Sequence, residues 1–96
     1  MAQTRDLEEY SLRFKQGWDR HFSKFDRETQ KRILAKFEHM KQPLLGRGLH
    51  QSNVQVEEVG GYRIAYVQDE NNRTKIIHFV GNHKQYEKWY LDAGRA

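Results

Sequence analysis

The chain has 96 residues and a mass of 11.6 kDa, which is enough for one domain with one small core. It contains no cysteine, which excludes disulfide scaffolds, cysteine-ligated zinc sites and thiol catalysis. No run of about 18 apolar residues is present, so we expect neither a membrane span nor a signal peptide. These features predict a cytoplasmic protein with no membrane partner.

The positive charge is concentrated in one stretch of the chain. Lys and Arg number 17 against 13 Asp and Glu, for a formal net charge of +4. Residues 11–47 carry ten basic side chains against four acidic ones, a net +6, whereas residues 48–96 balance at six and six. Such a stretch suits binding of a polyanion, because each neutralised phosphate releases a counterion. The same residues also suit the solvated faces of two amphipathic helices.

The first half of the chain predicts a strand followed by a helical hairpin. Apolar and polar residues alternate around Tyr10–Phe14, which is typical of a half-buried strand over about residues 9–15. A helical stripe then follows Gly17, formed by Trp18, Phe22 and Phe25.

The second helix of the hairpin is predicted to begin after Asp26, which is a suitable N-cap. Its apolar positions have helical spacing, and they are Ile33, Leu34, Phe37 and Met40. Pro43 forbids its continuation and opens a predicted loop over residues 43–53.

The second half of the chain changes to the period of two that is typical of strands. We expect a strand from Val54, a turn at Gly60-Gly61, and a returning strand over residues 62–67. A polar turn over residues 68–73 leads to a third strand over residues 74–80. Asn82 is the expected N-cap of a last short helix that ends at Tyr90 or Leu91.

The order β-α-α-β-β-β-α predicts a small single-domain α+β protein. The helices, including the hairpin, are expected on one face of a twisted, mainly antiparallel sheet. We expect residues 1–9 to form a disordered lead-in, with a short helix as the alternative, residues 10–91 to form the domain, and residues 92–96 to form a tail.

A symmetrical fold of the turn over residues 68–73 pairs Arg63 with His78. This register buries one face of the sheet under the helices, with Tyr62, Ile64, Tyr66, Ile77 and Phe79. A guanidinium beside an imidazole suits chemistry at a phosphodiester, since one group holds the phosphate and the other moves a proton. The alternative is a solvent-facing arginine beside a neutral histidine.

A second cluster lies on the predicted last helix, where His83, Tyr86 and Tyr90 fall at i, i+3 and i+7. His83 stands at the start of the helix, where the helix dipole favours an anion. The tyrosines also suit simple packing against the sheet. The remaining histidines lack metal-ligand spacing, so we expect neither a metal nor another cofactor.

Two segments resemble the RelE/ParE superfamily of toxin–antitoxin toxins. They are Gly-x-Tyr62-Arg63-x-x-Tyr66 and Gly81-x-His83-x-x-Tyr86, and the resemblance covers about residues 10–90. It implies a RelE-like fold and a toxin of a type II system that a cognate antitoxin neutralises. In the RelE-like branch it further implies a metal-independent endoribonuclease, an mRNA interferase that cleaves mRNA on the ribosome and represses translation.

The resemblance also assigns roles to particular residues. Arg63 matches the arginine that clamps the scissile phosphate, and His83 falls where relatives place an acid or charge stabiliser. Tyr86 or Tyr90 matches the C-terminal tyrosine that stacks on or activates the substrate. One departure concerns the strand before Arg63, where Glu57 and Glu58 replace the cations of relatives. Either glutamate serves as general base, or both are solvent-facing acids on a strand that has lost its positive charge.

Two other functions fit the same resemblance. A ParE-like toxin inhibits DNA gyrase by protein contact and cleaves nothing, and a toxin-fold protein without activity serves as a binding module. If the chain is a RelE-like nuclease, we expect the basic hairpin to contact ribosomal RNA.

Overall fold

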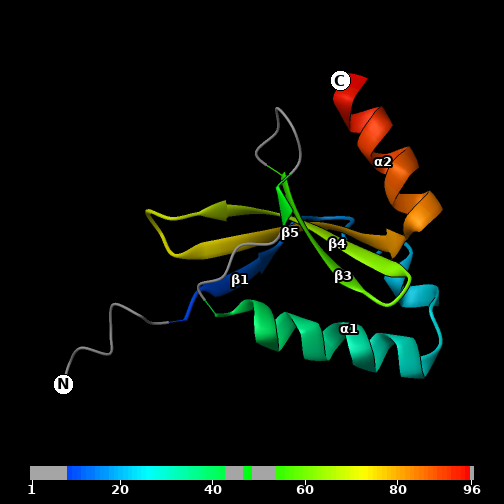
Figure 1. Cartoon of the computed structure of the whole chain (residues 1–96), viewed down its shortest axis with the longest axis horizontal. Coiled ribbons are helices and arrows are strands. Elements are labelled where there is room, and N and C mark those ends of the chain that lie inside the picture. The colour runs from blue at the N-terminus through cyan, green and yellow to red at the C-terminus, as the bar shows by residue number, and fades with distance from the viewer. Residues whose placement is uncertain (1–8, 43–46, 49–53, 96) are drawn as a thin grey trace.

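The structure is a computed structural model that describes residues 9–42, 47–48 and 54–95. A mixed sheet forms its centre, with strands in the order β1-β5-β4-β3-β2 (Figure 1). The strands and α-helices are β1 (Ser11–Phe14), α1 (Arg27–Met40), β2 (Arg47–Gly48), β3 (Val54–Val59), β4 (Tyr62–Asp69), β5 (Thr74–Asn82) and α2 (His83–Arg95). Only the β1–β5 pairing is parallel among these strands. The predicted α+β class and mainly antiparallel sheet are confirmed.

The ends of the chain and the predicted loop are only partly described. Residues 1–8, 43–46, 49–53 and 96 lie outside the described residues, so the lead-in and most of the loop stay predictions. α2 continues to Arg95, past the predicted end at Leu91. None of the helices in the described ranges has the length and apolar character needed to cross a lipid bilayer.

Helix α1 begins and packs as its sequence predicts. The Asp26 carboxylate accepts a hydrogen bond from the backbone N–H of Thr29 at 3.1 Å, which is the geometry of an N-cap. Ile33, Phe37 and Met40 are buried on one side of the helix, against β4 and β5. α1 therefore lies along one face of the sheet (Figure 1).

The predicted first helix of the hairpin is wrong. Residues 18–21 form turns, and a short 3-10 helix follows over Phe22–Lys24. The apolar stripe still packs on the core, because the rings of Trp18 and Phe22 lie 5.0 Å apart and Phe25 lies 4.8 Å from Tyr62. A short helix is marginal without its own hydrogen-bonded length, and here tertiary contacts of the rings hold the segment.

The predicted register between β4 and β5 is also wrong. β4 continues to Asp69, which pairs with Thr74 and whose carboxylate accepts hydrogen bonds from Asn72 in the turn. A bulge near Ala65 and Tyr66 then leaves His78 without a partner position on β4. Arg63 consequently lies opposite Gly81, and not opposite His78.

The bulge places apolar side chains on both faces of the sheet. Tyr66 and Ile77 face α1 as predicted, but Phe79 lies on the opposite face with Tyr86 of α2. The expectation that all helices cover one face is therefore wrong, because α2 packs against the other face (Figure 1). The sheet is covered on both sides, and the candidate residues surround α2.

Gly81 allows β5 and α2 to approach closely. A Cβ atom built on Gly81 would lie 2.7 Å from Cε2 of Phe79 and 3.0 Å from Cβ of Gln85. Cβ atoms in proteins essentially never lie within 3.0 Å of another side chain. Any larger residue at position 81 must therefore displace the Phe79 ring or the first turn of α2.

We expect Gly81→Ala to lower the free energy of unfolding by about 1–3 kcal/mol, which is typical of overpacking. Gly61→Ala is the matched control, because a Cβ atom there meets nothing within 4 Å. Urea titration followed by circular dichroism measures both variants. Equal stability of the two variants would contradict the close approach of α2 to β5.

Candidate functional site

Arg63 lies in an open hollow beneath one side of α2. Its Nε atom is 3.5 Å from Oε2 of Glu58, the residue opposite it on β3. Its guanidinium carbon lies 5.2 Å from the centre of the Tyr86 ring. The hollow has a volume of about 440 Å³, and its other lining residues come from α2: Tyr86, Glu87, Tyr90 and Leu91. Arg63, Tyr86 and Tyr90 thus line one hollow, whereas Glu58 only adjoins Arg63 and His83 is not among the lining residues.

The two tyrosines differ in exposure. Tyr86 is only 4% exposed and packs with Val56 and Ala65, whereas Tyr90 is partly exposed at the hollow. Their rings stack with centres 6.1 Å apart and an interplanar angle of 15°. The Arg63 guanidinium therefore packs over the buried Tyr86 ring, and Tyr90 is the more accessible of the two rings.

His83 is positioned at the start of α2 by a reciprocal cap. The Asn82 side chain accepts from the Gln85 N–H at 2.8 Å, and the Gln85 side chain accepts from the Asn82 N–H at 2.8 Å. The His83 side chain is 55% exposed, and its Nε2 lies 2.9 Å from Oε2 of Glu87. The predicted N-cap at Asn82 is confirmed.

Glu87 connects His83 to the hollow, and it is not among the site residues predicted from the sequence. It lines the hollow with Arg63 and contacts the His83 imidazole one helical turn away. The i,i+4 spacing between His83 and Glu87 was the available signal. Each basic group of this site thus has a carboxylate beside it, Glu58 for Arg63 and Glu87 for His83.

The two glutamates of β3 point to different faces of the sheet. Glu57 lies opposite Ile64 and pairs with Lys36 of α1 at 3.2 Å, with both side chains partly buried. Glu58 lies opposite Arg63 on the α2 side. Of the two candidate bases, Glu58 is the one that adjoins Arg63.

His78 lies away from Arg63, in a separate hollow that Lys15, Arg20 and Trp89 also line. Burial lowers the pKa of His78 below its usual value of 6.5, and the charge of Lys15 lowers it further. The predicted pairing of Arg63 with His78 fails because the longer β4 and the bulge shift the strands past one another.

His21 adjoins the same region and has a similar environment. Its ring meets the Phe79 ring edge to face, with centres 5.5 Å apart. Burial lowers the pKa of His21 most, followed by the charges of Arg20 and Lys24. In the part of the chain that the structure describes, no group of three or more His, Asp or Glu side chains is arranged to hold a metal ion.

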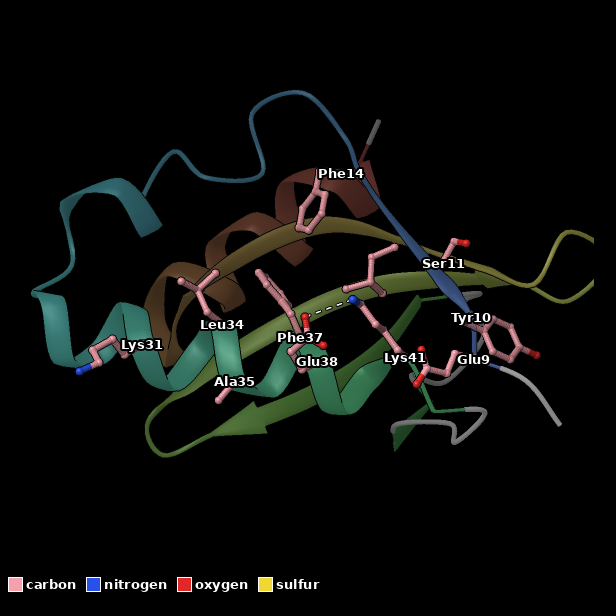
Figure 2. A pocket seen from close by; sticks show the side chains of 11 residues that line it. Glu9, Tyr10, Ser11, Phe14, Lys31, Leu34, Ala35, Phe37, Glu38 and Lys41 are labelled. Atoms are coloured by element: carbon pink, nitrogen blue, oxygen red, sulfur yellow. Dashed lines mark hydrogen bonds and ion pairs between the residues drawn. The ribbon is translucent and has the colours of Figure 1, made fainter. Parts of the chain in front are cut away.

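A larger groove of about 990 Å³ separates β1 from α1 (Figure 2). Phe14 and Leu34 line it and are 44% and 49% exposed, although both are large apolar residues. Lys41 and Glu38 form a 3.1 Å ion pair at its wall. None of the residues predicted for catalysis lines this groove.

The environments of His21 and His78 predict how stability depends on pH. Both imidazoles bind a proton more readily in the unfolded chain, near pH 6.5, than in the folded one. The free energy of unfolding should therefore be undiminished above that pH and fall as the pH drops through it. We expect the double variant His21→Gln/His78→Gln to lose less stability than the original chain between about pH 7 and about pH 5. Urea titrations at several pH values measure this, and parallel pH profiles would contradict it.

Neither a protein-family model nor a curated protein matches this sequence significantly. Solved structures do match the fold. A chain of the RelBE2 toxin–antitoxin complex of Mycobacterium tuberculosis aligns with a TM-score of 0.65 and 19% identity, over 80% of this chain and 94% of that one. A chain of the intact Escherichia coli RelBE complex aligns with a TM-score of 0.66 and 17% identity, over 76% and 95%.

The isolated Escherichia coli RelE toxin aligns with a TM-score of 0.61 and 16% identity, over 90% of this chain and 97% of that one. At such low sequence identity, the structural likeness shows a shared fold and nothing beyond it. It extends over nearly the whole of each matched chain, so it is not limited to a shared sheet motif. The chain therefore has the fold of the RelE toxins.

Proposed function

We propose that this chain is the toxin of a type II toxin–antitoxin system and that it cleaves mRNA on the ribosome without a metal ion. The observation that carries the proposal is the placement of Arg63, over the Tyr86 ring and open to a hollow beside α2. A guanidinium held in this way can donate two hydrogen bonds to a phosphate. The RelE fold supports the same conclusion.

The proposed reaction is attack of a ribose 2′-hydroxyl on the adjacent phosphorus. The 2′-oxygen–phosphorus bond forms, and the bond from phosphorus to the 5′-oxygen of the next nucleotide breaks. The products are a 2′,3′-cyclic phosphate and a free 5′-hydroxyl. Negative charge increases on the phosphoryl oxygens in the transition state, where Arg63 stabilises it.

Two protons must move during this reaction. We assign Glu58 as the acceptor of the 2′-hydroxyl proton, because it lies beside Arg63 and remains exposed. We assign His83 as the donor to the 5′-oxygen, with Glu87 as the positioning residue that holds its imidazole. His78 has no role in this reaction, because it lines a different hollow.

Tyr86 and Tyr90 take different parts in this proposal. The buried Tyr86 supports the Arg63 guanidinium from below. Tyr90 is the ring that a base of the substrate can stack on, since it is partly exposed at the hollow.

The proposed partners are a cognate antitoxin, mRNA and ribosomal RNA. The apolar groove between β1 and α1 leaves Phe14 and Leu34 uncovered, and β1 is an edge strand. An apolar antitoxin segment would bury this surface. Ribosomal RNA phosphates can approach the four Lys and Arg residues of α1.

The test is an in vitro translation reaction with purified toxin, in which the 5′ ends of the mRNA are mapped. We expect cleavage within the message, and Arg63→Ala should lower the cleavage rate by about 10²–10³-fold. His83→Gln should lower the rate by about 10²-fold, because it removes the proton donor. Arg73→Asn is the matched control, since it removes an exposed arginine from the β4–β5 turn, outside the proposed RNA contacts, and asparagine tolerates the positive φ of this position.

All variants are first compared with the original chain by thermal unfolding, so that loss of activity is not loss of the fold. Intact mRNA at concentrations that arrest growth would overturn the proposal. Inhibition of DNA supercoiling by purified gyrase, with intact mRNA, would identify a ParE-like activity instead.

A further inference from the structure

Two adjoining hollows lie on the side of α2 away from Arg63. Their volumes are about 350 Å³ and about 220 Å³, and both are lined by Arg20, Phe79 and Trp89. We call them together the histidine cleft, whose chemically distinctive residues are Lys15, Arg20, His21, His78, Lys88 and Trp89. The α2 residues that line the cleft lie on a different side of the helix from Tyr86 and Tyr90.

Three features of the backbone bring these residues together. The parallel pairing of β1 with β5 is extended by a 2.9 Å hydrogen bond from the Lys15 N–H to the Ile77 carbonyl. Gly17 has a φ of +89°, and it turns the chain toward Arg20 and His21. The bulge on β5 directs His78 into the same region. Residues far apart in the sequence thus form one surface.

The cations of the histidine cleft have no ion-pair partner among the described residues. Lys15, Arg20 and Lys88 line it, and no ion pair joins any of them to a carboxylate in the described ranges. Asp92 is the single acidic side chain among the lining residues that the structure describes. The contrast with Arg63 and His83, each beside a glutamate, makes this cleft the more electropositive of the two.

The two imidazoles respond to this positive field. His21 faces the charges of Arg20 and Lys24, His78 faces Lys15, and Lys88 and Asp92 of α2 complete the charged groups of the cleft. Burial and these cations lower the pKa of both imidazoles. A bound phosphate would oppose the cations, and binding would then raise the pKa of both histidines.

Trp89 adds an apolar surface to these charges. Its indole stacks on the Phe79 ring with centres 5.1 Å apart and an interplanar angle of 12°, and it lines both hollows. Cations that follow a backbone, together with an aromatic platform, are the two components of sites for single-stranded nucleic acid. A site for a free anion needs no such platform.

We propose that the histidine cleft binds the backbone of single-stranded RNA, as a site separate from the Arg63 hollow. Arg20, Lys15 and Lys88 contact phosphates, and Trp89 contacts a base or sugar. The inference shares with the proposed function only the class of ligand. It does not require that the chain cleaves RNA.

The first test is fluorescence anisotropy with a short, labelled, single-stranded 2′-O-methyl RNA, which lacks the nucleophile for cleavage. We expect Arg20→Ala/Lys88→Ala to weaken RNA binding at least about tenfold. The slope of the logarithm of the binding constant against the logarithm of the salt concentration should become shallower by about 0.7 for each phosphate that the protein no longer neutralises. The control Arg73→Asn/Lys84→Ala removes the same charge from exposed positions that line neither the cleft nor the Arg63 hollow. Equal loss of affinity in the two double variants would overturn the inference.

The second test follows the His21 and His78 imidazoles by NMR during pH titration. We expect the RNA to raise the pKa of both, and inorganic phosphate at the same phosphate concentration to raise them less. An equal rise with inorganic phosphate would show a site for free anions and contradict the inference. Displacement of the RNA by polyglutamate of equal charge would contradict it in favour of an acidic protein ligand.

RNA binding at the histidine cleft and cleavage at the Arg63 hollow can be lost independently. Arg63→Ala should abolish cleavage of mRNA while the 2′-O-methyl RNA still binds the histidine cleft. If mRNA stays intact with the original chain but the cleft variants lose RNA affinity, the proposed function fails and the inference stands. If the cleft variants bind RNA as tightly as the original chain, the inference is wrong whatever the cleavage assay shows.

Discussion

The packing of α2 against β5 is the contact on which both candidate sites depend. The bulge turns Phe79 to the α2 face, where its ring stacks on Trp89, and Gly81 lets the helix approach without a clash. The helix is held at the end of the sheet with one side toward Arg63 and the other toward His78. A change in the position of α2 would alter both hollows together.

The two sides of α2 differ in how their positive charges are balanced. Arg63 and His83 each lie beside a glutamate, which offsets their positive charge but supplies groups that accept and position protons. Lys15 and Arg20, on the other side, have no carboxylate partner within the described residues. We infer that the first arrangement serves chemistry at a phosphate and the second serves attraction of a polyanion.

Local signals predicted the elements, and non-local pairing decided the rest. The caps at Asp26 and Asn82 and the tyrosines after His83 could be found from spacing alone. The register of β5 could not, because a longer β4 and one bulge shift it without any change in apolar period. The prediction of a first helix was wrong, because ring contacts to the core, and not helical hydrogen bonds, hold residues 18–25.

The chemical ends of the cleaved RNA test the central claim most directly, because they record which oxygen attacked the phosphorus. Mass spectrometry of the fragments should find a 2′,3′-cyclic phosphate on the upstream piece and a 5′-hydroxyl on the downstream piece. Fragments ending in a 3′-hydroxyl and a 5′-phosphate would show that water attacked the phosphorus and that the 3′-oxygen was the leaving group. That result would contradict the reaction assigned to Arg63, Glu58 and His83.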